Sequence, residues 1–536
     1  MSEPYMKQSL NQTPTHTSIA RLLFDSAQRF AGHTAIEENG ERLDYADLPE
    51  RALQVTRGLM ALGIQPGDRV GVWAPNSREW ILAALGIHCA GAVLVPINTR
   101  MKGVEAADVL ARSCCRVLFV QQRFLDVDYP ALLAPHRPST LEHQVVFGCD
   151  QALPGQDLSY TQFLVGAATI EKLTAQRRAL CIAPEAVCDL LFTSGTTGKP
   201  KGVMSAHGQN LRAFGEYVRV LGLGPGDRYL IVNPFFHAFG YKAGWLTCLI
   251  AGATILPHAV FDAEVVFQRI ARERVTVLPG APTLYLSLLA HPRLAETDLS
   301  SLRVAVTGSA SIPPSLIERM RNELGFSVVT TAYGLTECGG LATLCDPRAS
   351  AEVIASTSGR PLPGTEVSIR DPDNQSLPQG QTGEICLRGF HIMQGYFQDP
   401  AATAEAIDAE GWLHTGDVGR LDADGNLAIT DRLKDMYIVG GFNCYPAEIE
   451  AALLAHPAIA QVAVIGVADA RMGEVGCACV VLRDGRQLNE QELIGWSRER
   501  MANYKVPRQV RFFSALPLNP SNKVAKNDLR AAVAQA

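Results

Sequence analysis

A run of apolar residues that ends in a loop of hydroxyls, glycines and lysines constrains this chain most. The run is Leu190–Phe192, and the loop is Thr193–Gly202. Apolar residues of this kind are typical of a buried strand, and glycines let backbone N–H groups approach a bound anion. Lys199 and Lys201 add positive charge. The stretch therefore predicts a polyphosphate-binding loop at the end of a strand, and a flexible surface loop is the alternative.

The spacing in this loop differs from the Walker A motif. That motif has four residues between its first glycine and its Gly-Lys pair, which Ser or Thr follows. Here Gly195 and Gly198 are three apart, and Pro200 follows Lys199. The sequence therefore predicts a different kind of phosphate loop, followed by a helix from about Gln209 to Leu221.

The pattern around the loop alternates between strands and helices. Val70–Ala74 is typical of a strand, Ser77 can cap a helix that carries Trp80–His88, and Ala92–Pro96 is typical of a second strand. This order predicts part of a parallel sheet. Residues 135–185 are less regular, and we expect them to be connecting structure.

Further strands are predicted downstream, and several end in small loops that contain glycine. Val275–Pro279 ends at Gly280, Leu302–Thr307 ends at Gly308, and Phe326–Thr331 is another strand. In parallel sheets, ligands bind at the carboxyl ends of the strands. We therefore expect a ligand site at these loops.

The length and the change of pattern predict more than one domain. A chain of 536 residues is too long for one ordinary core. From about Gly359 to Tyr396, short strands and Pro/Gly turns predict an antiparallel or barrel-like subdomain. The remainder predicts a small α+β domain. We place a large N-terminal domain at residues 1–433 and a small one at 434–536.

The composition limits the classes of partner. A net charge of −6 gives no electrostatic case for nucleic acid. The N-terminus has no basic-then-apolar signal pattern, and the longest apolar run, Trp245–Leu256, is too short to span a bilayer. The 13 cysteines form no C-x-x-C pair. We expect a cytoplasmic enzyme without a transmembrane segment, and a homodimer is compatible with the sequence.

An aromatic stretch, Asn233–Lys242, surrounds one histidine with phenylalanine and tyrosine. Glycine and alanine leave room between the rings. This is the composition of an apolar pocket with one polar group, His237, and an aromatic core segment with a structural histidine is the alternative.

Six blocks in this order carry a resemblance to a known family. They are Thr193–Gly202, His237, Tyr333–Glu337, Thr415–Asp417, Asp431–Lys434 and Lys523. Together they resemble the adenylate-forming superfamily, which includes acyl-CoA synthetases, luciferases and the adenylation domains of peptide synthetases. The resemblance implies an α/β fold. Its large N-terminal domain has two α/β sheet subdomains and a β-barrel-like subdomain, and its small C-terminal α+β domain is mobile.

The resemblance also implies the reaction and its co-substrates. A carboxylate attacks the α-phosphate of ATP to give an acyl-adenylate and pyrophosphate, and the thiol of coenzyme A then displaces AMP. Mg²⁺ would be bound by Glu337. Residues that resemble the ATP- and AMP-binding set are Thr193, Ser194, Gly195, Thr196, Thr197, Gly198, Lys199, Lys201, Gly308, Ser309, Ala310, Tyr333, Gly334, Thr336, Asp417 and Arg432.

The same resemblance assigns the catalytic and moving parts. Lys523 would be the adenylation lysine, with His237, Thr336 and Glu337 as the other catalytic residues. The family usually has glycine before this lysine, whereas Asn522 precedes it here. Lys434 would be the hinge of the small domain. The residues of the coenzyme A tunnel would be Gly440, Gly441 and Phe442.

The acid itself is open to several interpretations. Asn233–Leu246, Ala253–His258, Val277–Pro292 and Asp431–Glu450 resemble bacterial ligases that activate a bicyclic acid left after steroid rings A and B are degraded. That acid is 3-(7a-methyl-1,5-dioxo-octahydroinden-4-yl)propanoate, here HIP. The pocket residues expected from the resemblance are Phe236, His237, Trp245 and Ser309.

Two other functions stay open from the sequence. The same aromatic pocket would suit a medium-chain fatty acid or an aryl acid, because pocket contacts discriminate similar ligands by only about 1–3 kcal/mol per methylene. The alternative that is not an enzyme is a catalytically silent regulator that binds an adenylate. The presence of Lys523 and Glu337 favours an enzyme.

Overall fold

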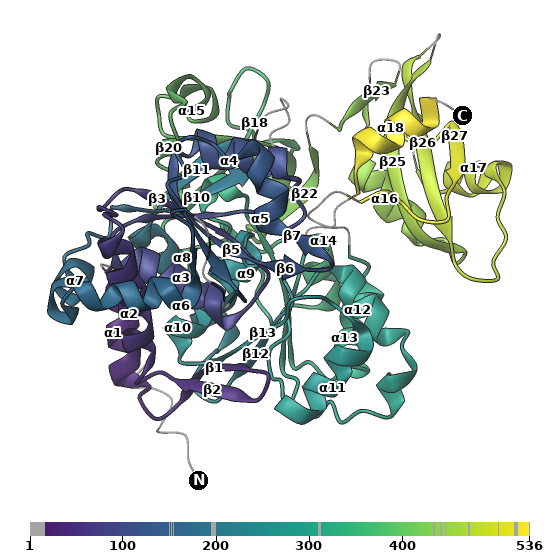
Figure 1. Ribbon diagram of the computed structural model, residues 1–536. Coiled ribbons are helices and arrows are strands. Elements are labelled where there is room, and N and C mark those ends of the chain that lie inside the picture. The colour runs from purple at the N-terminus through teal and green to yellow at the C-terminus, as the bar shows by residue number, and fades with distance from the viewer. Residues whose placement is uncertain are drawn as a thin grey trace.

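The computed structural model describes most of the chain (Figure 1). The described residues are 17–149, 151, 153, 155–193, 200–308, 312–432, 435–439, 442–444, 446–469, 472–501, 503–518 and 524–534. In this part of the chain, no helix is both long and apolar enough to cross a membrane.

An eight-stranded sheet, in the order β20-β11-β10-β4-β3-β5-β8-β9, forms the first subdomain. Neighbours from β10 to β9 pair in parallel, whereas β11 pairs antiparallel with β10 and β20. The strands are β3 (Arg69–Trp73), β4 (Val93–Pro96), β5 (Cys115–Gln121), β8 (His143–Phe147), β9 (Leu158–Ser159), β10 (Val187–Thr193), β11 (Lys201–Ala206) and β20 (Gly395–Tyr396). The predicted strand–helix–strand unit is confirmed as β3, α3 (Arg78–Cys89) and β4, and Oγ of Ser77 caps the helix by accepting from the N–H of Trp80 at 3.2 Å.

Helices cover this sheet, and Figure 1 shows one group of them together on one flank. That group contains α1 (Ile19–Arg29), α2 (Leu48–Ala61), α3, α6 (Tyr160–Gly166) and α7 (Lys172–Leu180), while α4 (Gly103–Arg112) and α5 (Tyr129–Leu133) lie apart from it. The prediction that residues 135–185 are irregular was wrong. Helix α6 buries Phe163, and α7 buries Ala175 and Ala179, so their apolar patterns are too sparse to detect.

A second sheet consists of two four-stranded parts joined by one residue. The first part is β12 (Arg228–Ile231), β13 (Thr254–Pro257), β1 (Thr34–Glu38) and β2 (Glu41–Asp44). The second is β14 (Val304–Thr307), β15 (Val328–Tyr333), β16 (Thr343–Leu344) and β17 (Arg360–Pro361). Val277 bridges Tyr229 and Val304 in parallel, so the strand predicted at 275–279 is reduced to one bridging residue.

The helices of this second sheet build a core of their own. They are α11 (Ala263–Glu273), α12 (Pro282–Leu289), α13 (Pro314–Asn322) and α14 (Ala351–Ser356). Between the two sheets, α8 (His207–Leu221) and α10 (Thr247–Ala251) bury residues in the same core as α1 and α3. Pro314 is the first residue of α13, a position where its missing N–H costs no helical hydrogen bond.

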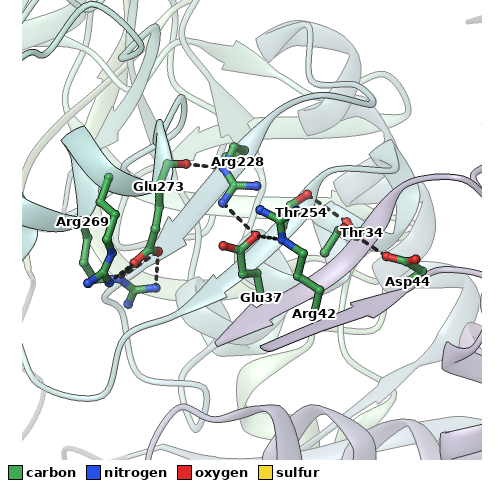
Figure 2. A network of polar contacts seen from close by, with 9 residues as sticks. Thr34, Glu37, Arg42, Asp44, Arg228, Thr254, Arg269 and Glu273 are labelled. Carbon is green, nitrogen blue, oxygen red and sulfur yellow. Dashed lines mark hydrogen bonds and ion pairs between the residues drawn. The ribbon is translucent and has the colours of Figure 1, made fainter. Parts of the chain in front are cut away.

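A network of ion pairs ties the β1–β2 hairpin to this sheet (Figure 2). Glu37 accepts from Arg42 at 2.9 Å and from Arg228 at 3.1 Å. Arg228 also donates to the carbonyl of Glu273, whose carboxylate pairs with Arg269 at 2.7 Å. The N-terminal hairpin is thereby held to β12 and α11.

The antiparallel subdomain predicted after Gly359 is the sheet β18 (Thr365–Arg370), β19 (Gly383–Gly389), β21 (Leu413–Leu421) and β22 (Leu427–Arg432). The C-terminal unit, at the upper right of Figure 1, has a separate sheet and core. It contains β23 (Tyr437–Val439), β24 (Phe442–Cys444), β25 (Ile459–Asp469), β26 (Gly473–Leu482), β27 (Gln509–Phe512), α16 (Pro446–Leu454), α17 (Glu490–Arg498) and α18 (Lys526–Ala534). The boundary between 433 and 434 stays a prediction.

Candidate active site

The candidate phosphate loop connects the two antiparallel strands of a β-hairpin, β10 and β11. Thr193, the last residue of β10, pairs with Lys201, the first residue of β11. The helix predicted from about Gln209 to Leu221 is confirmed as α8, which begins at His207. Strand β11, which the sequence did not predict, lies between the loop and this helix. Ser194, Gly195, Thr196, Thr197, Gly198 and Lys199 lie outside the described residues. The hairpin therefore places Thr193 and Lys201 side by side at the base of the predicted loop.

Glu337 lies in a short helical turn, η5 (Thr336–Cys338), that follows β15. The chain doubles back closely around it, because a Cβ at Gly334 would lie 2.4 Å from the carbonyl carbon of Gly340. The backbone carbonyl of Glu337 accepts from the N–H of Met393 at 2.8 Å. Only glycine fits at 334 without moving the backbone, so this turn holds Thr336 and Glu337 in a defined place.

Tyr396 joins this turn to the hairpin. Its Oη donates to Oε1 of Glu337 at 3.0 Å, and Nζ of Lys201 lies 4.9 Å from the centre of its ring. Burial, and then the charge of Glu337, raise the pKa of Tyr396, so the hydroxyl stays protonated and acts as a donor. A cation over an aromatic face is attracted by the ring quadrupole. Three side chains from β11, β20 and η5 thus meet at one place.

Asp417 is the second carboxylate of the site and lies on β21. It is 6% exposed, and its Oδ2 accepts from Oη of Tyr333 at 2.7 Å. Burial, followed by the charge of Asp417, raises the pKa of Tyr333 well above its ordinary value. Gly308 follows β14, which pairs in parallel with β15, so Gly308 and Tyr333 lie at the same edge of the sheet. Ser309 and Ala310 lie outside the described residues.

The part of β21 that carries Asp417 is held by a glutamate from the neighbouring strand, β19. Oε1 of Glu384 accepts from the N–H of Gly416 at 3.0 Å, and its Oε2 lies 2.8 Å from Nδ1 of His414. Oγ1 of Thr415 donates to the carbonyl of Ile385 at 2.7 Å. These contacts fix the backbone directly before Asp417. In the register of β21 and β22, Asp417 is the partner of Arg432, whose side chain is outside the description.

The aromatic segment begins beside Asn76, which lies just before α3. Nδ2 of Asn76 donates to the carbonyl of Asn233 at 2.9 Å, and its Oδ1 accepts from the N–H of Phe235 at 2.7 Å. His237 caps the short helix α9 (Ala238–Gly240) and is exposed, and Phe236 is half-buried. These two residues therefore lie at the surface of the segment, where a ligand can reach them.

A π-helical turn, η3 (Tyr241–Leu246), follows. Trp245 on this turn is fully buried, with its ring 4.9 Å from that of Tyr241 and 6.1 Å from that of Trp80. Its face is therefore covered by other rings. Its role in an acyl pocket stays a prediction, as do those of Phe236 and His237.

Several expected residues are not placed by the structure. Lys523, Lys434, Gly440 and Gly441 lie outside the described residues. Phe442 begins β24, and nothing is described of its side chain. Their proposed roles stay predictions.

Sequence reasoning missed Tyr396 and Glu384. Tyr396 is 59 residues from Glu337 and reaches it because β20 pairs with β11 at the sheet edge. A two-residue strand has too little pattern to predict. Glu384 lies within the short strands predicted from about Gly359 to Tyr396, but nothing in the sequence indicates which strand would lie beside it.

Comparison with protein families finds two matches. The AMP-binding enzyme family matches residues 23–397, and the AMP-binding enzyme C-terminal domain matches residues 448–523. Together these matches cover both the large body and the C-terminal unit.

Two bacterial proteins are similar along nearly the whole chain. A protein of Rhodococcus jostii (strain RHA1) is 48% identical over 528 residues, covering 97% of this chain and 99% of the relative. One of Mycobacterium tuberculosis (strain ATCC 25618 / H37Rv) is 48% identical over 499 residues, covering 93% and 95%. Both are named 3-[(3aS,4S,7aS)-7a-methyl-1,5-dioxo-octahydro-1H-inden-4-yl]propanoyl:CoA ligase.

A solved structure shares the fold. It is an anthranilate CoA ligase in complex with anthranoyl-AMP, with a TM-score of 0.87 and 29% identity, covering 98% of this chain and 99% of that chain.

Proposed function

The chain belongs to the AMP-binding enzymes, and on this premise we propose that the acid it activates is HIP, the bicyclic propanoate. The chain is an AMP-forming acyl-CoA ligase, which uses ATP and coenzyme A. The observation that carries the choice of acid is the near-half identity, along almost the full chain, to two ligases named for it.

The two carboxylates of the site support different tasks. Asp417 is buried and already accepts a hydrogen bond from Tyr333, so it can accept a further one from the ribose hydroxyls of ATP. Lys201, over the ring of Tyr396, is a cation for the phosphates. Thr193 and Thr336 would add hydroxyl contacts to the phosphates.

Glu337 is our candidate for the Mg²⁺ ligand. A carboxylate oxygen is the hard donor that Mg²⁺ takes in proteins, and Tyr396 fixes the orientation of this one. When bound, Mg²⁺ would offset the negative charge of the phosphates as the carboxylate approaches. The carboxylate of Glu337, held by the hydrogen bond from Tyr396, therefore fits Mg²⁺.

The remaining roles concern the C-terminal unit. Lys523 would bring its positive charge to the reacting carboxylate and the α-phosphate in the first half-reaction. Lys434 would be the hinge about which this unit turns, and Gly440, Gly441 and Phe442 would line the coenzyme A tunnel. Rotation of the C-terminal unit about this hinge would let one site serve both half-reactions and would keep water from the adenylate.

The test separates the two half-reactions. With ATP, Mg²⁺ and HIP, the protein should release pyrophosphate and hold the acyl-adenylate. Addition of coenzyme A should then yield AMP and the thioester, identified by mass spectrometry. Release of no pyrophosphate with HIP, octanoate, benzoate or cinnamate would favour the silent adenylate-binding regulator instead.

A further inference from the structure

A buried ion pair lies directly behind the candidate site. Nζ of Lys242 is 3.2 Å from Oδ1 of Asp189, and both side chains are 0% exposed. Lys242 also donates to Oγ of Ser205 at 3.1 Å. The second oxygen of Asp189 accepts from Nδ2 of Asn210 at 3.0 Å and from Sγ of Cys188 at 3.2 Å. The two charges are therefore held from several directions and are closed off from water.

The pair connects segments that carry the proposed site residues. Lys242 lies on η3, which follows the segment of His237. Asp189 and Ser205 lie on β10 and β11, the two strands that carry the phosphate loop. One ion pair thus spans from the aromatic segment to both strands of the hairpin.

The turn of Glu337 packs against the same group. A Cβ built at Gly339 would lie 3.5 Å from Oδ1 of Asn210, and one at Gly340 would lie 2.9 Å from Cβ of Ala238. The turn therefore rests on α8, whose Asn210 donates to Asp189, and on Ala238, the residue after His237. The aromatic segment, the hairpin of β10 and β11, and the turn of Glu337 therefore meet around this ion pair.

Stability by itself does not explain charges in this position. Replacing a buried ion pair by apolar residues of similar volume is often neutral or stabilising, whereas removal of one partner is strongly destabilising. The π-helical turn that presents Lys242 is also a rare conformation that is frequent at functional sites. Within it, Gly244 departs from helical geometry, with φ −94° and ψ −106°.

We propose that Lys242 and Asp189 are positioning residues for adenylation. Their ion pair sets the distance between the aromatic segment, which holds the acid, and the hairpin, which holds the phosphates of ATP. This inference rests on the proposed function, since it takes both roles from it. The pair touches neither substrate and acts through the backbone of η3, β10 and β11.

The experiment replaces both charges together, so that no single charge is left buried. The first variant is Asp189→Leu with Lys242→Met, and the second is Asp189→Asn with Lys242→Gln, which replaces both charges by neutral polar groups. The control is Glu37→Leu with Arg228→Met, a partly buried pair in the network of Figure 2. Each protein is compared with wild type by urea unfolding, by kcat/KM for pyrophosphate release, and by thioester formation from supplied acyl-adenylate.

We expect at least one double variant to unfold near the wild-type urea midpoint. Its kcat/KM for pyrophosphate release should nevertheless fall about tenfold or more, because small displacements of reacting groups are costly. Thioester formation from the adenylate should stay within about twofold of wild type, and the control should keep both rates.

A folded double variant that releases pyrophosphate at the wild-type rate would overturn the inference. A control variant that loses as much of this rate as the double variants would also overturn it. Failure of both double variants to fold would also overturn it, because the pair would then be needed for folding. A wild-type protein that releases no pyrophosphate with any acid would instead contradict the proposed function.

Discussion

Tyr396 contacts two charged groups of the site at once, Glu337 through its hydroxyl and Lys201 through its ring. Replacement by phenylalanine removes the first contact and keeps the second. If Glu337 holds Mg²⁺, loss of this support should raise the Mg²⁺ concentration for half-maximal pyrophosphate release by about tenfold, since such supporting contacts are worth 10–100-fold in metal affinity.

Tyr160→Phe, on α6 away from the site, is the matched control and should leave the Mg²⁺ dependence as it is. An unchanged Mg²⁺ requirement in Tyr396→Phe would count against Glu337 as the ligand.

Asp417 is expected to act on ATP and not on the acid. Asp417→Asn keeps the shape and removes the charge, and a hydrogen bond to a charged group is worth about 1.5–3 kcal/mol. We expect kcat/KM for ATP to fall by about 10–100-fold, with KM for the acid unchanged. Initial rates at varied ATP and varied acid separate the two. A rise in KM for the acid alone would contradict the ribose role.

His391 makes folding stability depend on pH. It is 1% exposed, and burial, followed by the charge of Arg212, lowers the pKa of this histidine to about 4. The unfolded chain takes up a proton near its ordinary pKa of 6.5, which the folded state resists. The contribution of His391 to the free energy of unfolding is therefore fully present above pH 6.5. It is lost as the pH falls towards 4, by about 3 kcal/mol.

Urea unfolding of wild type and His391→Gln at pH 7 and pH 5 measures this contribution. The variant should lose less stability between the two pH values than wild type. An equal loss in both proteins would contradict the assignment.

At the scale of elements, the close turn of α9 governs the aromatic segment. A Cβ at Gly240 would lie 2.2 Å from the carbonyl oxygen of Pro234 and 2.3 Å from that of Asn233. Gly240→Ala must therefore move the backbone, which we expect to cost about 1–3 kcal/mol and to raise KM for the acid.

Gly224→Ala is the matched control, because a Cβ at that position would have no atom within 4 Å. It should cost less than Gly240→Ala in unfolding free energy. If both variants keep the wild-type KM for the acid, the aromatic segment does not hold it.

Some of these elements could be predicted from the sequence, and others could not. The parallel unit of β3, α3 and β4 was predictable because its apolar residues follow a clear period and Ser77 caps the helix. The hairpin at Thr193 was not, since β11 is short and its few apolar residues follow no clear period. The contact of Glu337 with Tyr396 depends on the pairing of distant strands, which no local pattern encodes.

At the scale of the whole molecule, one lysine on the C-terminal unit is expected to serve a single half-reaction. Lys523→Ala should reduce pyrophosphate release by about 10³-fold or more, the size expected when a charge that stabilises the transition state is lost. Thioester formation from supplied acyl-adenylate should continue nearly unchanged. Equal loss of both half-reactions would contradict the role given to Lys523.

The identity of the acid is decided by kcat/KM for coenzyme A thioester formation with four acids. HIP, octanoate, benzoate and cinnamate are each supplied with ATP, Mg²⁺ and coenzyme A. We expect kcat/KM for HIP to exceed that for each of the other three acids by about 10²-fold or more, because the contributions of several pocket contacts add up. A higher value for octanoate, benzoate or cinnamate would contradict HIP as the substrate and leave the ligase chemistry in place.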